Sequence, residues 1–107
     1  MLVSVELEER PEPEIEATIY FCCLEAIHNA CKYAGPEAPV RVRIAEHAGA
    51  VRFEIADDGH GFRPGPPAGT GLLNIEDRVG ALGGTVEIES TTGGGVSVSG
   101  VIPDAFA

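Results

Sequence analysis

Residues 51–62 read Val51-Arg52-Phe53-Glu54-Ile55-Ala56-Asp57-Asp58-Gly59-His60-Gly61-Phe62. Apolar and polar residues alternate in the first half, which predicts a half-buried strand. Two carboxylates and two glycines follow at once, so we expect these groups at the C-terminal end of the strand. Glycines there allow a backbone to approach a flat or bulky ligand where a Cβ would clash. An Asp-Gly turn that merely ends a strand has the same sequence, so this stretch alone leaves both interpretations open.

The segments before this stretch predict a hairpin and a long helix. Residues 40–44 alternate in the same way, and a short loop with Gly49 at its tip joins them to residues 51–55, which predicts an antiparallel hairpin. A helix is expected from Pro13 to about Tyr33, where Gly35-Pro36 stops it. Residues 3–7 alternate ahead of this helix and predict a short strand with one wet face.

The segments after it predict a second helix and a second pair of strands. Residues 63–70 hold three prolines and two glycines, which is typical of a surface loop. A helix with an apolar face begins near Leu72 and ends at Gly83-Gly84. Strands are expected around residues 86–88 and 96–102. The predicted fold is therefore a two-layer α/β sandwich, in which a mixed, mostly antiparallel sheet carries the helices on one face.

The long helix carries two stripes of side chains. A core-facing apolar stripe is predicted at helical spacing, and it comprises Ile15, Ile19, Cys22, Cys23, Ala26, Ile27 and Ala30. Glu25, Asn29 and Lys32 stand at i, i+4 and i+7, which places them on one polar stripe beside it. Each of the three residues also fits an ordinary solvated helix face, and Glu25 could simply pair with Lys32.

Composition limits the class of protein. The chain has 107 residues, 44% of them hydrophobic, which suits one folded domain spanning residues 1–107. A net charge of −10 argues against a nucleic-acid surface or direct membrane contact, because both need a basic patch. Three cysteines, Cys22, Cys23 and Cys31, make a poor disulfide framework and favour buried thiols in a reducing compartment. We therefore expect a cytoplasmic domain, or the cytosolic part of a membrane-bound sensor.

Four motifs together resemble those of a known superfamily. They are Glu25-x-x-x-Asn29-x-x-Lys32, Asp57-x-Gly59-x-Gly61, Gly69-x-Gly71-Leu72 and Gly93-Gly94-Gly95, in that order. They are similar to the asparagine box and three glycine boxes of the Bergerat-fold (GHKL) ATPases. Residues 19–26, residues 71–84 and the terminal Val101-Ile102-Pro103 resemble most the catalytic ATP-binding domain of sensor histidine kinases of the nitrate-sensor type.

The resemblance implies a role for each motif residue. Asp57 would accept a hydrogen bond from the adenine amine, with Asp58 as the alternative partner, and Gly59 and Gly61 would lie against the base and ribose. Asn29 would bind Mg²⁺, Lys32 would neutralise phosphate charge, and Glu25 would be the catalytic residue beside the γ-phosphate. The nucleotide-binding segment Gly69, Gly71 and Leu72 would form a hinged lid, in which Leu72 packs. His60 and Arg78 are expected on solvated surfaces, and His28 is expected to be a satisfied histidine of the long helix.

The function implied is that of a protein histidine kinase. The domain would bind Mg·ATP and donate the γ-phosphoryl to a histidine on a separate dimerisation domain of the same or a sister protein, and so act indirectly on a response regulator. His28, His47 and His60 all lie inside the ATP-binding fold, so the chain is not expected to phosphorylate itself. The stimulus, the cognate regulator and the oligomeric state do not follow from the sequence.

Two alternatives stay open at this point. The first is a serine kinase of the anti-sigma type, which shares the fold and the boxes but differs in the helix after the second glycine box. The second is a non-catalytic nucleotide-binding module. Tyr33 and Val96 favour it, because relatives usually carry a histidine and a hydroxyl residue there, whereas the intact Glu25 and Asn29 argue against it.

Overall fold

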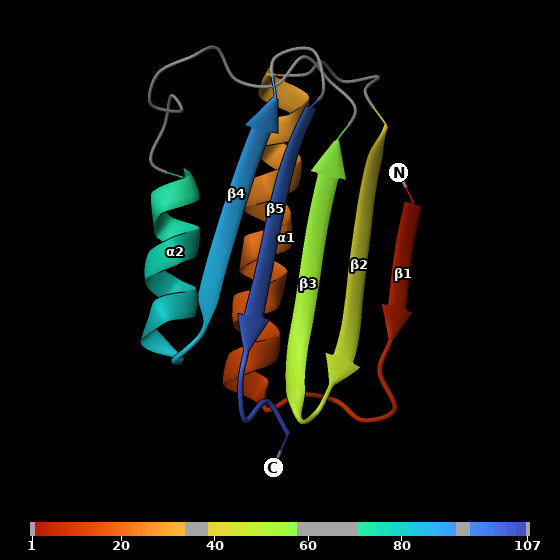
Figure 1. Ribbon diagram of the computed structural model, residues 1–107, viewed down its shortest axis with the longest axis vertical. Coiled ribbons are helices and arrows are strands. Elements are labelled where there is room, and N and C mark those ends of the chain that lie inside the picture. Colours follow the sequence, from red (N-terminus) through yellow and green to blue (C-terminus); the bar gives the residue numbers. More distant parts are fainter. Residues whose placement is uncertain (1, 34–38, 58–70, 92–94, 107) are drawn as a thin grey trace.

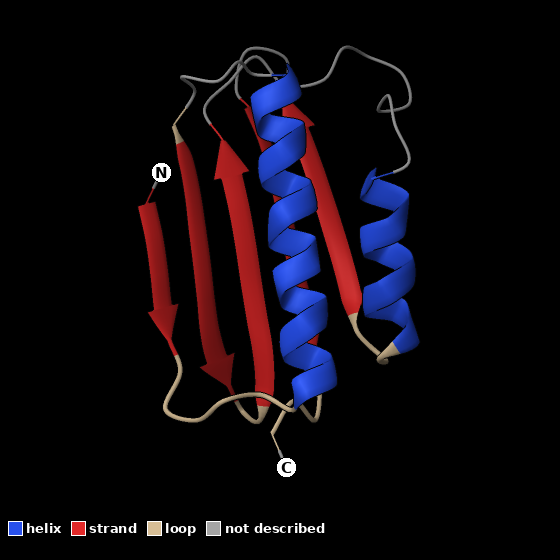
Figure 2. Ribbon diagram, turned by 180° about the vertical axis from the view of Figure 1, so that it is seen from behind, coloured by secondary structure: helices blue, strands red, loops and turns tan. Residues whose placement is uncertain are grey.

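The computed structural model describes residues 2–33, 39–57, 71–91 and 95–106, and it has two layers (Figure 1). The elements are β1 (Leu2–Glu6), α1 (Pro13–Tyr33), β2 (Val40–His47), β3 (Ala50–Asp57), α2 (Gly71–Ala81), β4 (Thr85–Thr91) and β5 (Gly95–Ile102). The sheet has the order β1-β2-β3-β5-β4, with β1 parallel to β2 and every other pair antiparallel. Both helices lie on one face of the sheet (Figure 2). The predicted sandwich and its order of elements are confirmed.

Local sequence signals set the ends of the helices. Pro13 opens α1, where its missing N–H costs nothing, and Glu14 and Glu16 lie in the first turn, at the positive end of the helix dipole. At the other helix, Gly83 adopts φ +78° directly after α2. The N–H of Gly84 then donates to the carbonyl of Val79 at 3.0 Å, and the N–H of Gly83 to that of Gly80 at 3.0 Å, which together form a Schellman cap.

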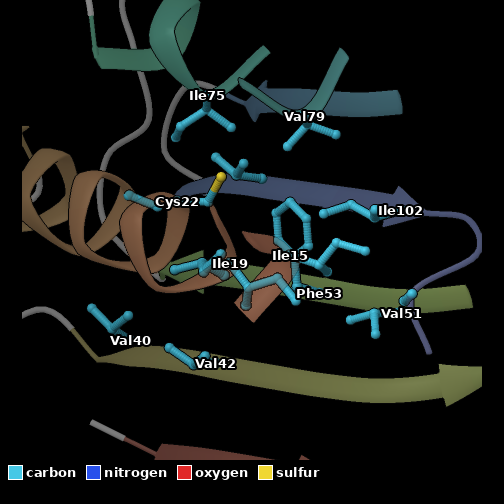
Figure 3. Close-up of a cluster of buried hydrophobic side chains, with 14 residues drawn as sticks. Ile15, Ile19, Cys22, Val40, Val42, Val51, Phe53, Ile75, Val79 and Ile102 are labelled. Atoms are coloured by element: carbon cyan, nitrogen blue, oxygen red, sulfur yellow. The ribbon is translucent and has the colours of Figure 1, made fainter. Parts of the chain in front are cut away.

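The core lies between the sheet and the two helices (Figure 3). Ile15, Ile19 and Cys22 of α1 and Ile75 and Val79 of α2 are buried against the sheet. The strands contribute a matching set, which comprises Val40, Val42, Val51, Phe53, Ile55, Val98 and Ile102. Successive members from β2 and from β3 are two residues apart, and Val98 and Ile102 of β5 are four apart, so each strand's members share one face, as the predicted alternation requires. This core fixes which face of β3 turns toward the helices.

The two helices cover only part of the width of the sheet. Two predictions from the sequence therefore need correction. Every residue of β1 is exposed, so this strand has no buried face. Cys23 and Ile27 are half-buried rather than part of the buried stripe, which runs through Ile19, Cys22 and Ala26. Both differences have one cause, because α1 lies over the middle of the sheet and leaves its β1 edge uncovered (Figure 2). Ala30, the last predicted member of the stripe, lies outside the described side chains.

The end of the molecule with the β2–β3 turn is held by short connections. His47 pairs with Ala50, so Ala48 and Gly49 alone form the turn, and both have positive φ (52° and 82°). This is the geometry of a type I′ turn. The N–H of Ala105 donates to the Gly49 carbonyl at 3.1 Å, and the N–H of Glu12 donates to the Ala105 carbonyl at 2.9 Å. The C-terminus therefore ties the hairpin to the start of α1.

Candidate functional site

The predicted motifs adjoin one end of the molecule. β3 and β4 end there at Asp57 and Thr91, and α1 ends there at Tyr33 (Figure 1). α2 begins at the same end with Gly71, as does β5 with Gly95. This convergence follows from the topology, because antiparallel neighbours bring the end of one strand beside the start of the next. Sites built by loops at one end of a rigid scaffold are a common arrangement in binding proteins.

Asp57 occupies a buried position at this end. It is the last residue of β3, and its residue exposure is only 7%. It continues the alternation of Phe53 and Ile55, so its side chain belongs to the face that the helices cover. Carboxylates are almost never this buried without a role or a partner. The strand therefore carries an acceptor-only group into the space between the two layers, at the end where the motifs meet.

Glu25 lies on the flank of α1 that faces α2. It is half-buried and stands one turn after Phe21, whose ring is contacted from α2. The backbone of α1 continues as a helix through Asn29 and Lys32, so the predicted spacing along the helix is present. The side chains of these two residues lie outside the described part of the structure. Glu25 in the helix layer and Asp57 in the sheet layer therefore lie toward the same end of the molecule.

The glycine motifs are described only in part. Gly71 begins α2 and Leu72 follows it in the helix, as predicted, although the side chain of Leu72 is not described. Asp58, Gly59, His60, Gly61 and Gly69 lie outside the described residues. The roles predicted for them stay predictions.

One contact near the site was missed by the sequence interpretation. The guanidinium of Arg78 in α2 lies 4.0 Å from the centroid of the Phe21 ring in α1. Arg78 is exposed, as expected, and it also makes this contact. A cation held over an aromatic face is attracted by the ring quadrupole, and the contact joins the helix of Glu25 to the helix that starts at the site. A pairing between two helices so far apart in the chain leaves no signal in the local periodicity.

The thiols of Cys22 and Cys23 in α1 are unsuited to nucleophilic chemistry. Burial raises the pKa of Cys22 to about 12, with a smaller contribution from the neighbouring Cys23. Burial likewise raises the pKa of Cys23 to about 11. Both groups are therefore protonated at neutral pH, and a protonated thiol is a poor nucleophile and metal ligand. This agrees with the structural role expected for these two residues.

No helix within the described residues combines the length and the apolar character needed to cross a membrane.

Comparison with known proteins identifies the family and the fold. Residues 14–105 match the family model of the histidine kinase-, DNA gyrase B- and HSP90-like ATPases. The chain is 39% identical over 83 residues to the signal transduction histidine-protein kinase/phosphatase UhpB of Salmonella typhimurium. It is 35% identical over 98 residues to the oxygen sensor histidine kinase NreB of Staphylococcus carnosus. These alignments cover 77% and 89% of this chain.

A solved structure gives the same result. The full-length ShkA structure, a complex with AMPPNP, superimposes with a TM-score of 0.70 at 26% identity, over 99% of this chain and 26% of that one. The chain spans only 16% and 28% of the lengths of UhpB and NreB. It therefore corresponds to one region of each of these longer kinases. The family match covers most of the chain, so the chain belongs to the histidine kinase-, DNA gyrase B- and HSP90-like ATPases.

Proposed function

We propose that this domain, residues 1–107, holds Mg·ATP at the end where β3 and α1 finish, and donates the γ-phosphoryl to a histidine on a separate dimerisation domain. The observation that carries the proposal is the burial of Asp57 at that end, beside the helix layer that holds Glu25. The ShkA structure, which has the same fold, is a complex with the nucleotide AMPPNP. A nucleotide at this end of the fold is therefore the ligand that the site supports best.

Asp57 is the residue proposed to select the base. A buried carboxylate accepts hydrogen bonds and donates none, so it suits the 6-amino group of adenine. Guanine presents a carbonyl at that position, and two acceptors would then face each other without a proton between them. Gly59 and Gly61 follow Asp57 in the chain, and their lack of a Cβ lets the base lie close to the backbone.

The phosphates and the metal are proposed to lie between α1 and α2. Glu25 and Asn29 provide oxygen donors, which suit a small hard cation, so this pair fits Mg²⁺, with Asn29 as the ligand. When bound, Mg²⁺ would neutralise the charge on the triphosphate. Lys32 adds a cation to the same stripe. Gly71 and Leu72 begin α2, and Gly69 precedes them in the sequence. The free N–H groups at the N-terminus of α2 would bind anionic oxygens of the phosphates.

Glu25 is proposed to assist the acceptor. A carboxylate at this position can accept the N–H proton of the incoming imidazole and hold the ring so that its other nitrogen faces the γ-phosphorus. The phosphorus–nitrogen bond then forms as the bond to the β-phosphate oxygen breaks. Most of the catalysis comes from positioning and charge neutralisation, as in other phosphoryl transfers. We propose that the domain works in the cytoplasm and that a response regulator receives the phosphoryl group next.

Isothermal titration tests the assignment of Asp57. Wild type is expected to bind Mg·ATP more tightly than Mg·GTP, and Asp57→Asn to bind Mg·ATP at least tenfold more weakly, since it replaces a charged acceptor. Asp104→Asn is the matched control, because Asp104 is exposed and follows the opposite end of β5. Thermal unfolding shows whether each variant is folded. Equal affinity of wild type and Asp57→Asn for Mg·ATP would remove the assignment.

A further inference from the structure

The face of the sheet opposite the helices is open, and opposite charges gather on its two sides. This face is turned toward the viewer in Figure 1, where α1 lies behind the strands. On β2, Arg41 and Arg43 are exposed on either side of the buried Val42. On β4, Glu87 and Glu89 are exposed, and the residue between them packs against the core. Because successive side chains of a strand point to opposite faces, all four charges lie on the open face.

Two rows of directly paired residues cross the open face from β2 to β4. One row comprises Arg43, Glu54, Ser99 and Glu87. The next row comprises Arg41, Ala56, Ser97 and Glu89. In each row an arginine on β2 lies level with a glutamate on β4, and the residue of β5 between them is a serine. The sheet register therefore sets positive and negative groups at matching heights on opposite sides of the face.

The middle of the open face is hollowed between these two groups. A shallow trough of about 810 Å³ lies over the strands, and Arg43, Glu54, Glu87 and Ser99 are among the residues that line it. The guanidinium of Arg43 lies 3.5 Å from the carboxylate of Glu6 in β1, but both side chains are exposed, so this pair contributes little. The charged side chains thus stand around a lower centre, where another surface can approach.

We propose that the open face binds the same face of a second copy of this chain. A symmetric dimer uses one patch on both copies, so the patch must be complementary to itself. A two-fold axis parallel to the strands, between β3 and β5, meets this condition because it places β4 of one copy over β2 of the other and keeps each row at its own height. Arg43 then faces Glu87 of the second copy. Arg41 likewise faces Glu89 of the second copy.

The charges also select this axis over the alternative. A two-fold axis across the strands would place β2 over β2 and β4 over β4, so that like charges would oppose one another. Stacked sheets lie about 10 Å apart, and an extended arginine and an extended glutamate together span that distance. Glu54 lies beside the proposed axis and would face Ser99 of the second copy, whose hydroxyl can donate to the carboxylate.

The size of the shared surface predicts a weak association. Four strands at about 4.8 Å spacing, with about six residues each at about 3.3 Å, give a flat area of roughly 400 Å² on each copy. This is small for an interface between proteins, and most of its contacts are polar. The dimer should therefore form at high protein concentration, or where longer proteins hold two copies close together.

The axis determines how the two copies are oriented. Rotation about an axis parallel to the strands preserves the strand direction, so the ends that contain Asp57 point the same way in both copies. The helix layers lie on the two outer sides of the pair. Self-association through the open face would therefore leave both proposed nucleotide sites accessible and side by side.

Charge reversal within one row tests this inference. Sedimentation equilibrium at high protein concentration is expected to show a dimer for wild type. Arg43→Glu and Glu87→Arg should each weaken self-association roughly tenfold or more, because symmetry turns two attractive contacts into two repulsive ones. An equimolar mixture of the two variants should associate as well as wild type, since both contacts are then restored with their signs exchanged. Glu76→Arg is the control, because it makes the same charge change on an exposed position of α2.

The outcomes separate a specific contact from a general effect of charge. The net charge of the chain is −10, so general repulsion would make Glu87→Arg associate more strongly than wild type, as it would Glu76→Arg. That result overturns the proposal, as does a mixture that stays monomeric. A monomeric wild type also overturns it and leaves the face to solvent or to a different protein.

Two further measurements keep the test clear. Thermal unfolding shows whether each variant is folded, and if Arg43→Glu is not, Arg41→Glu mixed with Glu89→Arg repeats the test in the next row. Titration with Mg·ATP should give the wild-type affinity for every variant, because the open face is opposite the helix layer. The proposed function can therefore fail while self-association is confirmed, and the reverse.

Discussion

At the scale of single residues, the pair Arg78 and Phe21 holds the two helices of the layer together at a defined point. Phe21 stands one turn before Glu25, and Arg78 reaches it from α2. A guanidinium–ring contact therefore connects α1 to α2. Glu25 of α1 would orient the acceptor histidine, and α2 starts at the proposed phosphate end. Neither Phe21 nor Arg78 belongs to the four motifs, yet their contact connects the two helices that carry Glu25 and Gly71.

A double-mutant cycle measures this coupling. Phe21→Leu, Arg78→Gln and the double variant are compared with wild type by urea unfolding. The interaction energy is expected to be about 0.5–1 kcal/mol, the range of cation–π pairs at exposed sites. Phe21→Leu combined with Arg52→Gln is the control, because Arg52 is an exposed arginine of β3 rather than of α2. Strict additivity of Phe21→Leu and Arg78→Gln would show that the contact contributes nothing.

At the scale of elements, the turn between β2 and β3 contains a residue in an unfavourable backbone conformation. Ala48 adopts φ 52°, a left-handed conformation that costs an L-residue with a Cβ roughly 1–2 kcal/mol. Gly49 takes the second positive φ at no such cost. Type I′ turns prefer Asn-Gly at these two positions. The Ala-Gly pair therefore makes this turn less stable than Asn-Gly would.

Substitutions in this turn are expected to act in opposite directions. Ala48→Asn should raise the free energy of unfolding by about 0.5–1 kcal/mol, since Asn tolerates the left-handed region. Gly49→Ala should lower it by about 1 kcal/mol through backbone strain alone, because nothing lies within 4 Å of the Cβ it would add. Chemical denaturation measures both. A destabilised Ala48→Asn variant would show that the turn is held by contacts other than its own backbone preference.

Most of the fold could be predicted from the sequence because its signals are local. The start of α1 at Pro13, the hairpin of residues 40–57 and the glycine cap after α2 each depend on a few neighbouring residues. Periodicity could not tell which flank of α1 is covered, so Cys23 and Ile27 were assigned to the core. It also could not show that β1 lies beyond the helix layer, because that depends on the order of the strands.

The candidate site was predictable to a lesser extent. The alternation along β3 correctly indicated that Asp57 follows buried residues on one face, and the structure buries it. The contact of Arg78 with Phe21, one turn before Glu25, joins two helices that are far apart in the chain, and no local pattern contains it. Gly59, Gly61 and Gly69 were assigned through the resemblance, and they lie outside the described residues.

At the scale of the whole molecule, the two ends of the sandwich differ in structure and in proposed function. One end is closed by the Ala48–Gly49 turn, the Gly83–Gly84 cap and the backbone hydrogen bonds of Ala105. At the other end lie the last residue of β3, the end of α1 and the start of α2 (Figure 1). A rigid closed end supports binding at the opposite end, as in many proteins whose loops bind ligands on a fixed scaffold.

The central claim is that the nucleotide binds at the end that contains Asp57. Backbone amide chemical shifts, measured by NMR while Mg·ATP is added to the chain, test it most directly. We expect the largest changes at the end of β3, in the last turns of α1 and at the start of α2, with almost none at Ala48, Gly49 or Gly83. Changes centred on the turn end of the molecule would contradict the account.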